Sequence, residues 1–272
     1  MSRLLTHAED FPELTKAKLE RAQKDPDALL KPDFNVCVFC SAGTRDKGLI
    51  KMSEKLGASI ANQNWGCISG LGATGMMGGV VRGATKIIEV QKKAHTDKRG
   101  WVGGSNLERI LKMEGPPVYY DRLWLEKDIY KRMDSMIDNS DAFLIMPGGM
   151  GTVQEFMALL MLKQDKTKKQ DQKFPQMHDK PIIIVNSEFT NLKGEKVHFW
   201  DGLIHLAKEY GFNKSHEDFI VAKSVQDAMK ILREKEPEIV AQKEKEGLLK
   251  EDRHDRYRAA ILAEQGQERT KD

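Results

Sequence analysis

The chain has 272 residues, 40% hydrophobic and 31% charged, so it can bury a sizeable core but is too rich in charge for a membrane protein. No apolar run reaches the ~18–20 residues that cross a bilayer, and Glu9 and Asp10 interrupt the first residues before a signal peptide could form, so we expect a cytoplasmic protein without a membrane partner. The net charge of +3 is too small to predict nucleic acid as the main partner.

The first 32 residues are charged and weakly helical in pattern, and Pro26 and Pro32 separate them from the rest of the chain. We expect residues 1–32 to form an N-terminal helical arm. From Asp33 onward, apolar runs alternate with helical periods, which predicts stacked βαβ units. The runs are those of buried parallel strands, at Val36–Cys40, Trp65–Ser69, Ala142–Met146 and Pro181–Asn186. The fold class predicted for residues 33–235 is therefore α/β, a Rossmann-like doubly wound parallel sheet with helices on both faces.

Helical periods fill the intervals between these runs. We expect helices near Leu49–Gln63, Met76–Lys86, Leu125–Ser140, Val153–Gln164, Trp200–Tyr210 and Ser224–Glu234. Residues 163–180 are polar and rich in Lys and Gln, which indicates an exposed insertion. Residues 236–272 are dominated by charges and are predicted to be a solvated helical or partly disordered tail.

Cys37 and Cys40 have the C-x-x-C spacing of redox pairs and of half zinc sites. A zinc site needs two further ligands, whereas Cys67 stands alone, and a redox pair usually opens a helix. The residues around this pair are almost all apolar. We therefore interpret the spacing as part of a buried strand and expect no metal site.

Three predicted strands end in loops rich in small residues. The first loop begins at Cys40, the second at Gly70 and the third at Pro147. In an open parallel sheet such loops lie at the ligand-binding edge, and their backbone amides and the following helix N-terminus favour an anion. Three such loops predict a small molecule that carries a phosphate, although glycines can also serve helix–sheet packing alone.

The second loop, with Gly70, Gly72 and Gly75, also matches the dinucleotide fingerprint G-x-G-x-x-G. Glu89 would then be the acid that binds the ribose. No clear strand ends at Glu89 and no hydride-transfer residues are recognisable, so a dinucleotide remains only an alternative, and we expect no cofactor.

The third loop leads into a predicted helix that carries Glu155. Thr152 and Glu155 have the spacing of a capping box, in which both would serve the helix terminus. Alternatively, Glu155 is a carboxylate one turn from a phosphate-binding loop, available to act on a bound sugar. Arg132 falls at the edge of the apolar stripe of its own helix, where either a structural salt bridge or a ligand contact is possible.

These motifs resemble those of the LONELY GUY (LOG) family, often labelled lysine decarboxylases. The hallmark P-G-G-x-G-T-x-x-E appears without a mismatch from Pro147 to Glu155. The arginine of the family's R-K-x-x-M segment corresponds to Arg132, with Met133 in place of the lysine. The resemblance extends over about residues 34–234 and includes the first two loops.

The resemblance implies a phosphoribohydrolase that cleaves the N-glycosidic bond of a nucleoside 5′-monophosphate and releases the free base and ribose 5-phosphate. It implies Glu155 and Arg132 as catalytic residues and no redox cofactor. It also implies a homodimer or larger homo-oligomer. Residues expected to bind the phosphate or the rest of the substrate are Gly148, Gly149, Gly151, Thr152, Ser41, Thr44, Arg45, Gly72, Gly75 and Glu114.

The insertion is longer than in compact plant-type members and resembles that of the bacterial nucleoside-monophosphate nucleosidases, and the arm and tail extend beyond the compact core. These features favour AMP or a related nucleotide over a cytokinin riboside 5′-monophosphate, which remains the alternative. A non-catalytic carrier of a nucleotide or of molybdenum cofactor, or a nucleotide sensor, is a further alternative. Decarboxylation is disfavoured, since no lysine has a recognisable pyridoxal-phosphate context.

Overall fold

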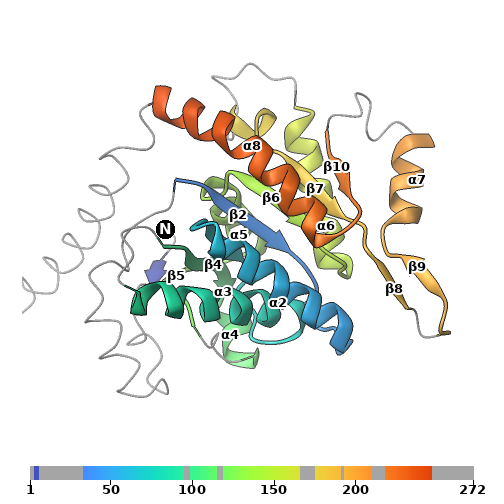
Figure 1. The fold of residues 1–272 in the computed structure, drawn as a ribbon, viewed down its shortest axis with the longest axis horizontal. Helices are drawn as coiled ribbons and strands as arrows, with labels where there is room; N and C mark the ends of the chain where they lie inside the picture. Colours follow the sequence, from blue (N-terminus) through green and yellow to red (C-terminus); the bar gives the residue numbers. More distant parts are fainter. Residues whose placement is uncertain are drawn as a thin grey trace, which may run out of the picture.

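The computed structural model of the chain describes residues 3–5, 33–94, 99–114, 119–165, 175–190, 193–209 and 218–246. Its centre is an eight-stranded sheet in the order β1-β5-β4-β3-β2-β6-β7-β10 (Figure 1). β1 (Arg3–Leu5) pairs antiparallel with β5, and the other seven strands are parallel to one another. Those seven are β2 (Asn35–Phe39), β3 (Gly66–Ser69), β4 (Trp101–Leu107), β5 (Arg122–Glu126), β6 (Ala142–Ile145), β7 (Ile182–Val185) and β10 (Ile220–Ala222). The predicted doubly wound parallel sheet is confirmed.

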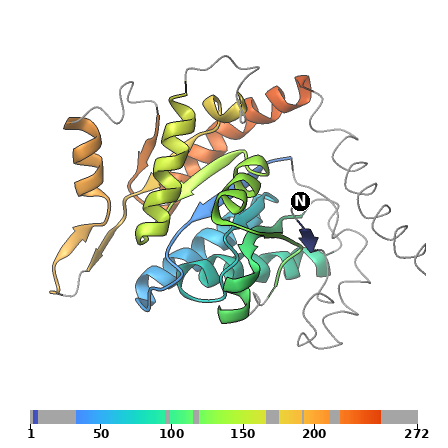
Figure 2. The ribbon, with the colours of Figure 1, turned by 180° about the vertical axis from the view of Figure 1, so that it is seen from behind.

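Helices cover both faces of the sheet. In Figure 1, α2 (Lys47–Asn62), α3 (Gly75–Lys93) and α8 (Val225–Lys245) lie in front of it, and Figure 2 shows α5 (Ile129–Asp138) and α6 (Met150–Lys163) on the opposite face. The remaining elements are α4 (Glu108–Glu114), a 3₁₀ turn (Pro175–His178), α7 (Asp201–Glu209) and a separate hairpin of β8 (Glu188–Thr190) and β9 (Lys196–His198). None of the helices in these described ranges combines the length and apolar character needed to cross a membrane.

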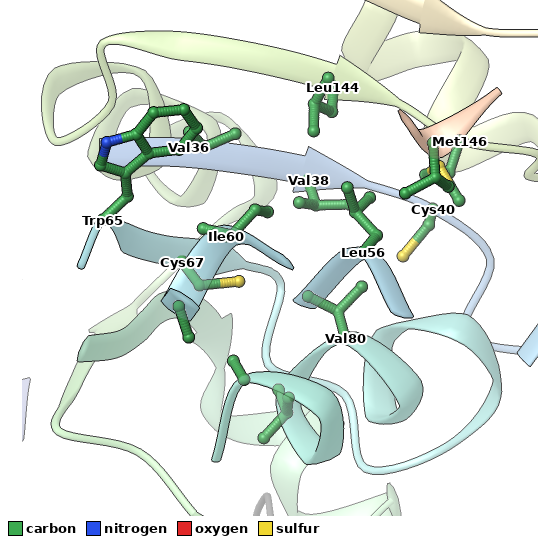
Figure 3. Close-up of a cluster of buried hydrophobic side chains, with 14 of the residues drawn as sticks. Val36, Val38, Cys40, Leu56, Ile60, Trp65, Cys67, Val80, Leu144 and Met146 are labelled. Atoms are coloured by element: carbon green, nitrogen blue, oxygen red, sulfur yellow. The ribbon is translucent and has the colours of Figure 1, made fainter. Parts of the chain in front are cut away.

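Each face of the sheet has its own hydrophobic core. Figure 3 shows the core beneath α2 and α3, where Val36 and Val38 of β2 belong to one cluster with Leu56 and Val80 of the two helices. Cys40 belongs to this core and Cys37 to the opposite one, so the two thiols lie on different faces of the sheet. All three cysteines are free and buried. The C-x-x-C segment is thus a buried strand and its end, as the sequence predicts.

Strand order reverses at β2, because β3, β4 and β5 extend to one side of it and β6, β7 and β10 to the other. In a doubly wound sheet the ligand site lies at such a switch point, outside the carboxyl ends of the strands. A ligand site is therefore expected at the loops after β2 and β6.

Some elements differ from those the sequence predicts. The sequence pattern does not predict β4, β5 or β10. For β4 the reason is that Gly103, Gly104 and Ser105 break its apolar run. The helix expected from Leu125 begins at Ile129, because Leu125 and Glu126 complete β5.

The ends of the chain are described only in part. Apart from β1, the expected arm at residues 1–32 lies outside the described residues, as do 166–174 of the insertion and 247–272 of the tail. The boundary expected at 235/236 falls within α8. Near the end of this helix, the buried Lys243 donates to Asp141 Oδ2 at 2.7 Å, and this bond ties the helix to the start of β6.

Candidate functional site

Three glycine-rich loops meet at the carboxyl edge of the sheet. Ser41, after β2, connects them through its backbone, since its N–H donates to Pro147 O at 3.2 Å and its carbonyl accepts from Met76 N at 2.8 Å. The Thr74 hydroxyl adds a bond to Ala42 O at 2.9 Å. The structure thus brings together the loops after β2, β3 and β6.

The second loop is built mainly for packing. Gly75 has φ +56°, and a Cβ there would lie 2.4 Å from Ala42 O, so the close approach of the first loop requires glycine. The amides of Met76 and Met77 at the start of α3 both donate to Ser41 O. Two of the donors that a phosphate would need at this helix terminus are therefore already used.

The dinucleotide alternative is not supported by the position of Glu89. The fingerprint places its ribose-binding acid at the end of the second strand, whereas Glu89 lies inside α3. The segment around it is helical, and the next strand, β4, begins only at Trp101.

The third loop leaves a helix N-terminus accessible. α6 begins at Met150 after Gly149, which has no side chain to accept from the first-turn amides. Gly149 and Gly151 are exposed, and a Cβ on either would meet no atom within 4 Å. Unlike the start of α3, this terminus presents amides and a partial positive charge to open space, as an anion site requires.

The capping box expected of Thr152 and Glu155 is not formed. Thr152 lies within the first turn of α6 instead of before it, and the helix has no side-chain cap. The Thr152 side chain packs against Gly148, where a Cβ would lie 2.1 Å from its Oγ1. Glu155 therefore does not cap the helix, and its carboxyl group is available for a bound ligand.

Arg132 and Glu155 come together at the centre of this edge. Arg132 extends from α5, its Nε donates to Ser105 O at 2.9 Å, and its Nη2 lies against Gly70, where a Cβ would be 1.9 Å away. Its Nη1 is 3.8 Å from Glu155 Oε1. Both residues are buried, with side chains 10% and 8% exposed.

This pair keeps most of its hydrogen-bonding capacity. The 3.8 Å separation is an ion pair but too long for a hydrogen bond. Among the described residues, the Nη groups of Arg132 and both carboxylate oxygens of Glu155 have no hydrogen-bond partner. A buried guanidinium and carboxyl with unused donors and acceptors are suited to a polar ligand.

Burial raises the pKa of Glu155 from 4.5 to about 7, and the neighbouring Arg132 opposes this effect. A carboxyl group that titrates near neutral pH can take up or release a proton during a reaction. The chemistry available at this edge is therefore acid–base catalysis beside an anion site.

The other predicted residues occupy different parts of the edge. Ser41 and Thr44 are half-buried in the first loop, and the Ser41 hydroxyl accepts from Thr44 N at 3.1 Å. Arg45 is exposed beside them, and Gly72 is buried in the second loop. Glu114 ends α4, and its side chain lies outside the described residues.

Two contacts of Arg132 were not expected from the sequence. Gly70 provides the space for the guanidinium and Ser105 O accepts from it, although the glycine pattern had suggested a ligand loop at Gly70. The sequence offered one indication of this contact. Ser105 and Asn106 are polar residues near the end of a segment that begins with Trp101 and Val102, as in a strand that ends at the binding edge.

Comparison with known proteins places these residues in a family. The family described as "Possible lysine decarboxylase" matches residues 88–242, more than half of the chain. A "Cytokinin riboside 5'-monophosphate phosphoribohydrolase" of Mycobacterium tuberculosis is 26% identical over 200 residues, which are 73% of this chain and 92% of that protein. A protein of the same description from Arabidopsis thaliana is 25% identical over 158 residues, 56% of this chain and 62% of that protein.

Among solved structures, the molybdenum cofactor binding protein of Rippkaea orientalis superposes with a TM-score of 0.49 at 19% identity. The alignment covers 76% of this chain and 98% of that one.

Proposed function

The chain belongs to the LOG family, the family described as "Possible lysine decarboxylase", and we propose that it hydrolyses the N-glycosidic bond of a nucleoside 5′-monophosphate. The products would be the free base and ribose 5-phosphate. The observation that carries the proposal is the buried pair of Arg132 and Glu155, 3.8 Å apart with unused hydrogen-bonding capacity, one turn from the accessible start of α6.

The start of α6 is the proposed phosphate site. The amides that follow Gly149 lack partners inside the helix, and the absence of side chains at Gly149 and Gly151 lets a phosphate approach them. Gly151 and Glu155 are four residues apart, on the same face of α6. A ribose attached to the bound phosphate would therefore be held beside the carboxyl group, and this fixed orientation lowers the barrier to reaction.

Glu155 is the proposed catalytic acid–base. Cleavage breaks the bond from C1′ to the base nitrogen and forms one from C1′ to a water oxygen, through a state with positive charge on the ribose. The ionised carboxylate stabilises that charge and accepts a proton from the attacking water. The base leaves with the bonding electron pair and takes up the proton that Glu155 accepted from the water, which returns the carboxylate to its ionised form.

Arg132 is the proposed partner of both carboxylate and substrate. Its Nε is held by Ser105 O, so the Nη donors keep a fixed direction. These donors can hydrogen-bond to the nucleotide, while the positive charge lowers the pKa of Glu155 and partly offsets the effect of burial. The hydroxyls of Ser41 and Thr44, Arg45 and the buried Gly72 would complete the wall of the site on the side of the first two loops.

We propose AMP or a related nucleotide as the substrate. The M. tuberculosis and A. thaliana relatives are named for cytokinin riboside 5′-monophosphates, which supports an adenine-type base. The long segment at 163–180, the arm at 1–32 and the charged tail at 236–272 favour an unmodified nucleotide over a cytokinin, because compact plant-type members have a shorter segment and lack such extensions.

A cytoplasmic location and a homodimer or larger homo-oligomer are further parts of the proposal. The three unpaired cysteines are typical of a reducing compartment. α6 exposes Met150 and Met161, at 83% and 75%, and α5 exposes Tyr130 at 73%. α5 and α6 cover the same face of the sheet, and large apolar side chains exposed on their outer surface are typical of an interface with a second copy of the chain.

The proposal is tested by incubating the purified protein with AMP, GMP, CMP, UMP and isopentenyladenosine monophosphate. Chromatography would detect the free base and ribose 5-phosphate, and the rates would rank the bases. We expect release from AMP to be fast. Binding of nucleotides without any release would contradict the enzyme and favour a carrier or sensor.

A further inference from the structure

The first turn of α5, which precedes Arg132, has little apolar anchorage. Ile129, Tyr130 and Lys131 are all exposed. Their position depends on Asp128, whose carboxylate accepts from the amides of Tyr130 and Lys131, each at 2.9 Å. This cap fixes the beginning of the helix through bonds within the helix itself.

The second turn is held to the sheet by a polar contact. The Ser135 hydroxyl donates to Oε1 of Glu126, the last residue of β5. Glu126 is 4% exposed, and Ser135 is the only hydrogen-bond partner of its carboxyl group among the described residues. Ser135 is three residues after Arg132, so both point from the same face of α5 toward the sheet.

The two contacts of this helix face span neighbouring strands. Ser135 bonds to β5 through Glu126, while Arg132 bonds to β4 through Ser105 O at 2.9 Å. β4 and β5 are paired directly, with Leu107 opposite Glu126. A shift of α5 along the sheet would break both bonds and move the Arg132 guanidinium relative to Glu155.

We propose that Glu126, through its hydrogen bond to Ser135, is a positioning residue that holds Arg132 in the orientation required for the reaction. The inference rests on the proposed function only for its effect on turnover. Its structural part, the dependence of the Arg132 position on Glu126, stands independently.

A purely stabilising role does not account for a carboxyl group at this position. Burying it is unfavourable compared with an apolar side chain of similar size, and a single hydroxyl satisfies only part of its hydrogen-bonding capacity. Methionine at position 126 could fill the space without that cost. What methionine cannot supply is the directional bond to Ser135, which acts together with the buried Met136 and Ile137 in fixing the position of α5.

Two pairs of variants distinguish the effect of the Ser135–Glu126 hydrogen bond from the effect of side-chain volume. Glu126→Met and Ser135→Ala remove the bond, whereas Glu126→Gln and Ser135→Thr keep an acceptor and a donor in place. We expect Glu126→Met to lower kcat roughly ten- to hundredfold, the effect of a displacement of about 1 Å, with an unchanged or higher Tm. Glu126→Gln should restore most of the rate. Glu234→Gln, an exposed change on α8, is the matched control.

The decisive comparison is made in the Arg132→Ala background. If Glu126 acts through Arg132, Glu126→Met adds no further loss of kcat there, and neither does Ser135→Ala. A loss that multiplies with that of Arg132→Ala would overturn the proposal, as would a Glu126→Gln variant as slow as Glu126→Met.

A crystal structure of the Glu126→Met variant tests the positioning independently of activity. We expect the bond from Arg132 Nε to Ser105 O to be broken or the guanidinium displaced from Gly70. An unmoved Arg132 would refute the inference even if the enzyme is active. If the wild type releases no base, the proposed function fails, and this structure still decides the positioning role.

Discussion

The guanidinium of Arg132 lies 3.8 Å from the carboxylate of Glu155, close enough for electrostatic attraction and too far for a hydrogen bond. The two residues come from adjacent helices, α5 and α6, and meet where the strand order reverses. A structural salt bridge would be expected to close to hydrogen-bond distance. The separation, together with the shortage of other partners, is more typical of a pair that holds a ligand between its members.

Gly149→Ala tests the anion site at the start of α6. Because an added Cβ would meet no protein atom within 4 Å, and φ is −87°, we expect the free energy of unfolding to change by less than about 1 kcal/mol. The Cβ would project into the space of the phosphate, so affinity for AMP should fall about tenfold or more. Calorimetric titration with AMP measures the change, and an affinity equal to that of the wild type would refute the assignment.

Gly75→Ala is the matched change in the second loop, with the opposite expectation. A Cβ there would lie 2.4 Å from Ala42 O in a backbone conformation of positive φ. We expect a loss of about 2 kcal/mol or more in the free energy of unfolding, because both the contact and the conformation are unfavourable. Urea unfolding checks it. Stability like that of Gly149→Ala would mean that the second loop is not fixed by packing.

Gly70→Ala should mimic the loss of Arg132. The new Cβ would lie 1.9 Å from Arg132 Nη2, so the guanidinium must move away from its position beside Glu155. We expect kcat to fall about as far as in Arg132→Ala, and the double variant to be no slower than either single one. Steady-state kinetics of the three variants would show this. Normal turnover in Gly70→Ala would indicate that the observed position of Arg132 is not the active one.

The sequence predicts most of this arrangement through its strongest local patterns. The apolar runs of β2, β3, β6 and β7 identify a parallel sheet, and the glycine loops after three of them identify its binding edge. β4 escapes detection because Gly103 and Gly104 weaken its apolar pattern. Gly103 nevertheless has a clear physical reason, since a Cβ there would lie 1.9 Å from the Trp101 ring.

At the candidate site, too, local sequence motifs identify the residues but not the contacts that they make in the folded protein. Arg132 and Glu155 can be selected from their motifs, but which glycine accommodates which side chain depends on contacts between segments far apart in sequence. The sequence pattern around Gly70 suggests a ligand-binding loop, whereas in the structure Gly70 provides the space that the Arg132 guanidinium occupies. The capping box at Thr152 failed for a similar reason, since α6 begins two residues earlier, at Met150.

The stability of the protein should depend on pH through Glu155. Burial raises its pKa from 4.5 to about 7, so folding favours the protonated form. The contribution of this group to stability is therefore complete below about pH 4.5 and is lost as the pH rises through 7. Because one pKa unit corresponds to about 1.4 kcal/mol, wild type should lose roughly 3 kcal/mol relative to Glu155→Gln across this interval.

Urea unfolding of both proteins between pH 4 and pH 8 would measure this difference. Above about pH 8 the two curves should run parallel, since the carboxyl group is then ionised in both the folded and unfolded states. A difference that stays constant from pH 4 to pH 8 would mean that Glu155 is not held in a buried environment.

The catalytic role of Glu155 can be measured by comparing wild type with Glu155→Gln on AMP. Free adenine and ribose 5-phosphate would be quantified over time, and AMP binding to each protein would be measured by calorimetry. We expect equal amounts of the two products from the wild type. For the variant we expect at least about a hundredfold slower release, with AMP affinity within a few-fold of wild type. Undiminished release by Glu155→Gln would contradict the assignment of Glu155 as the catalytic acid–base.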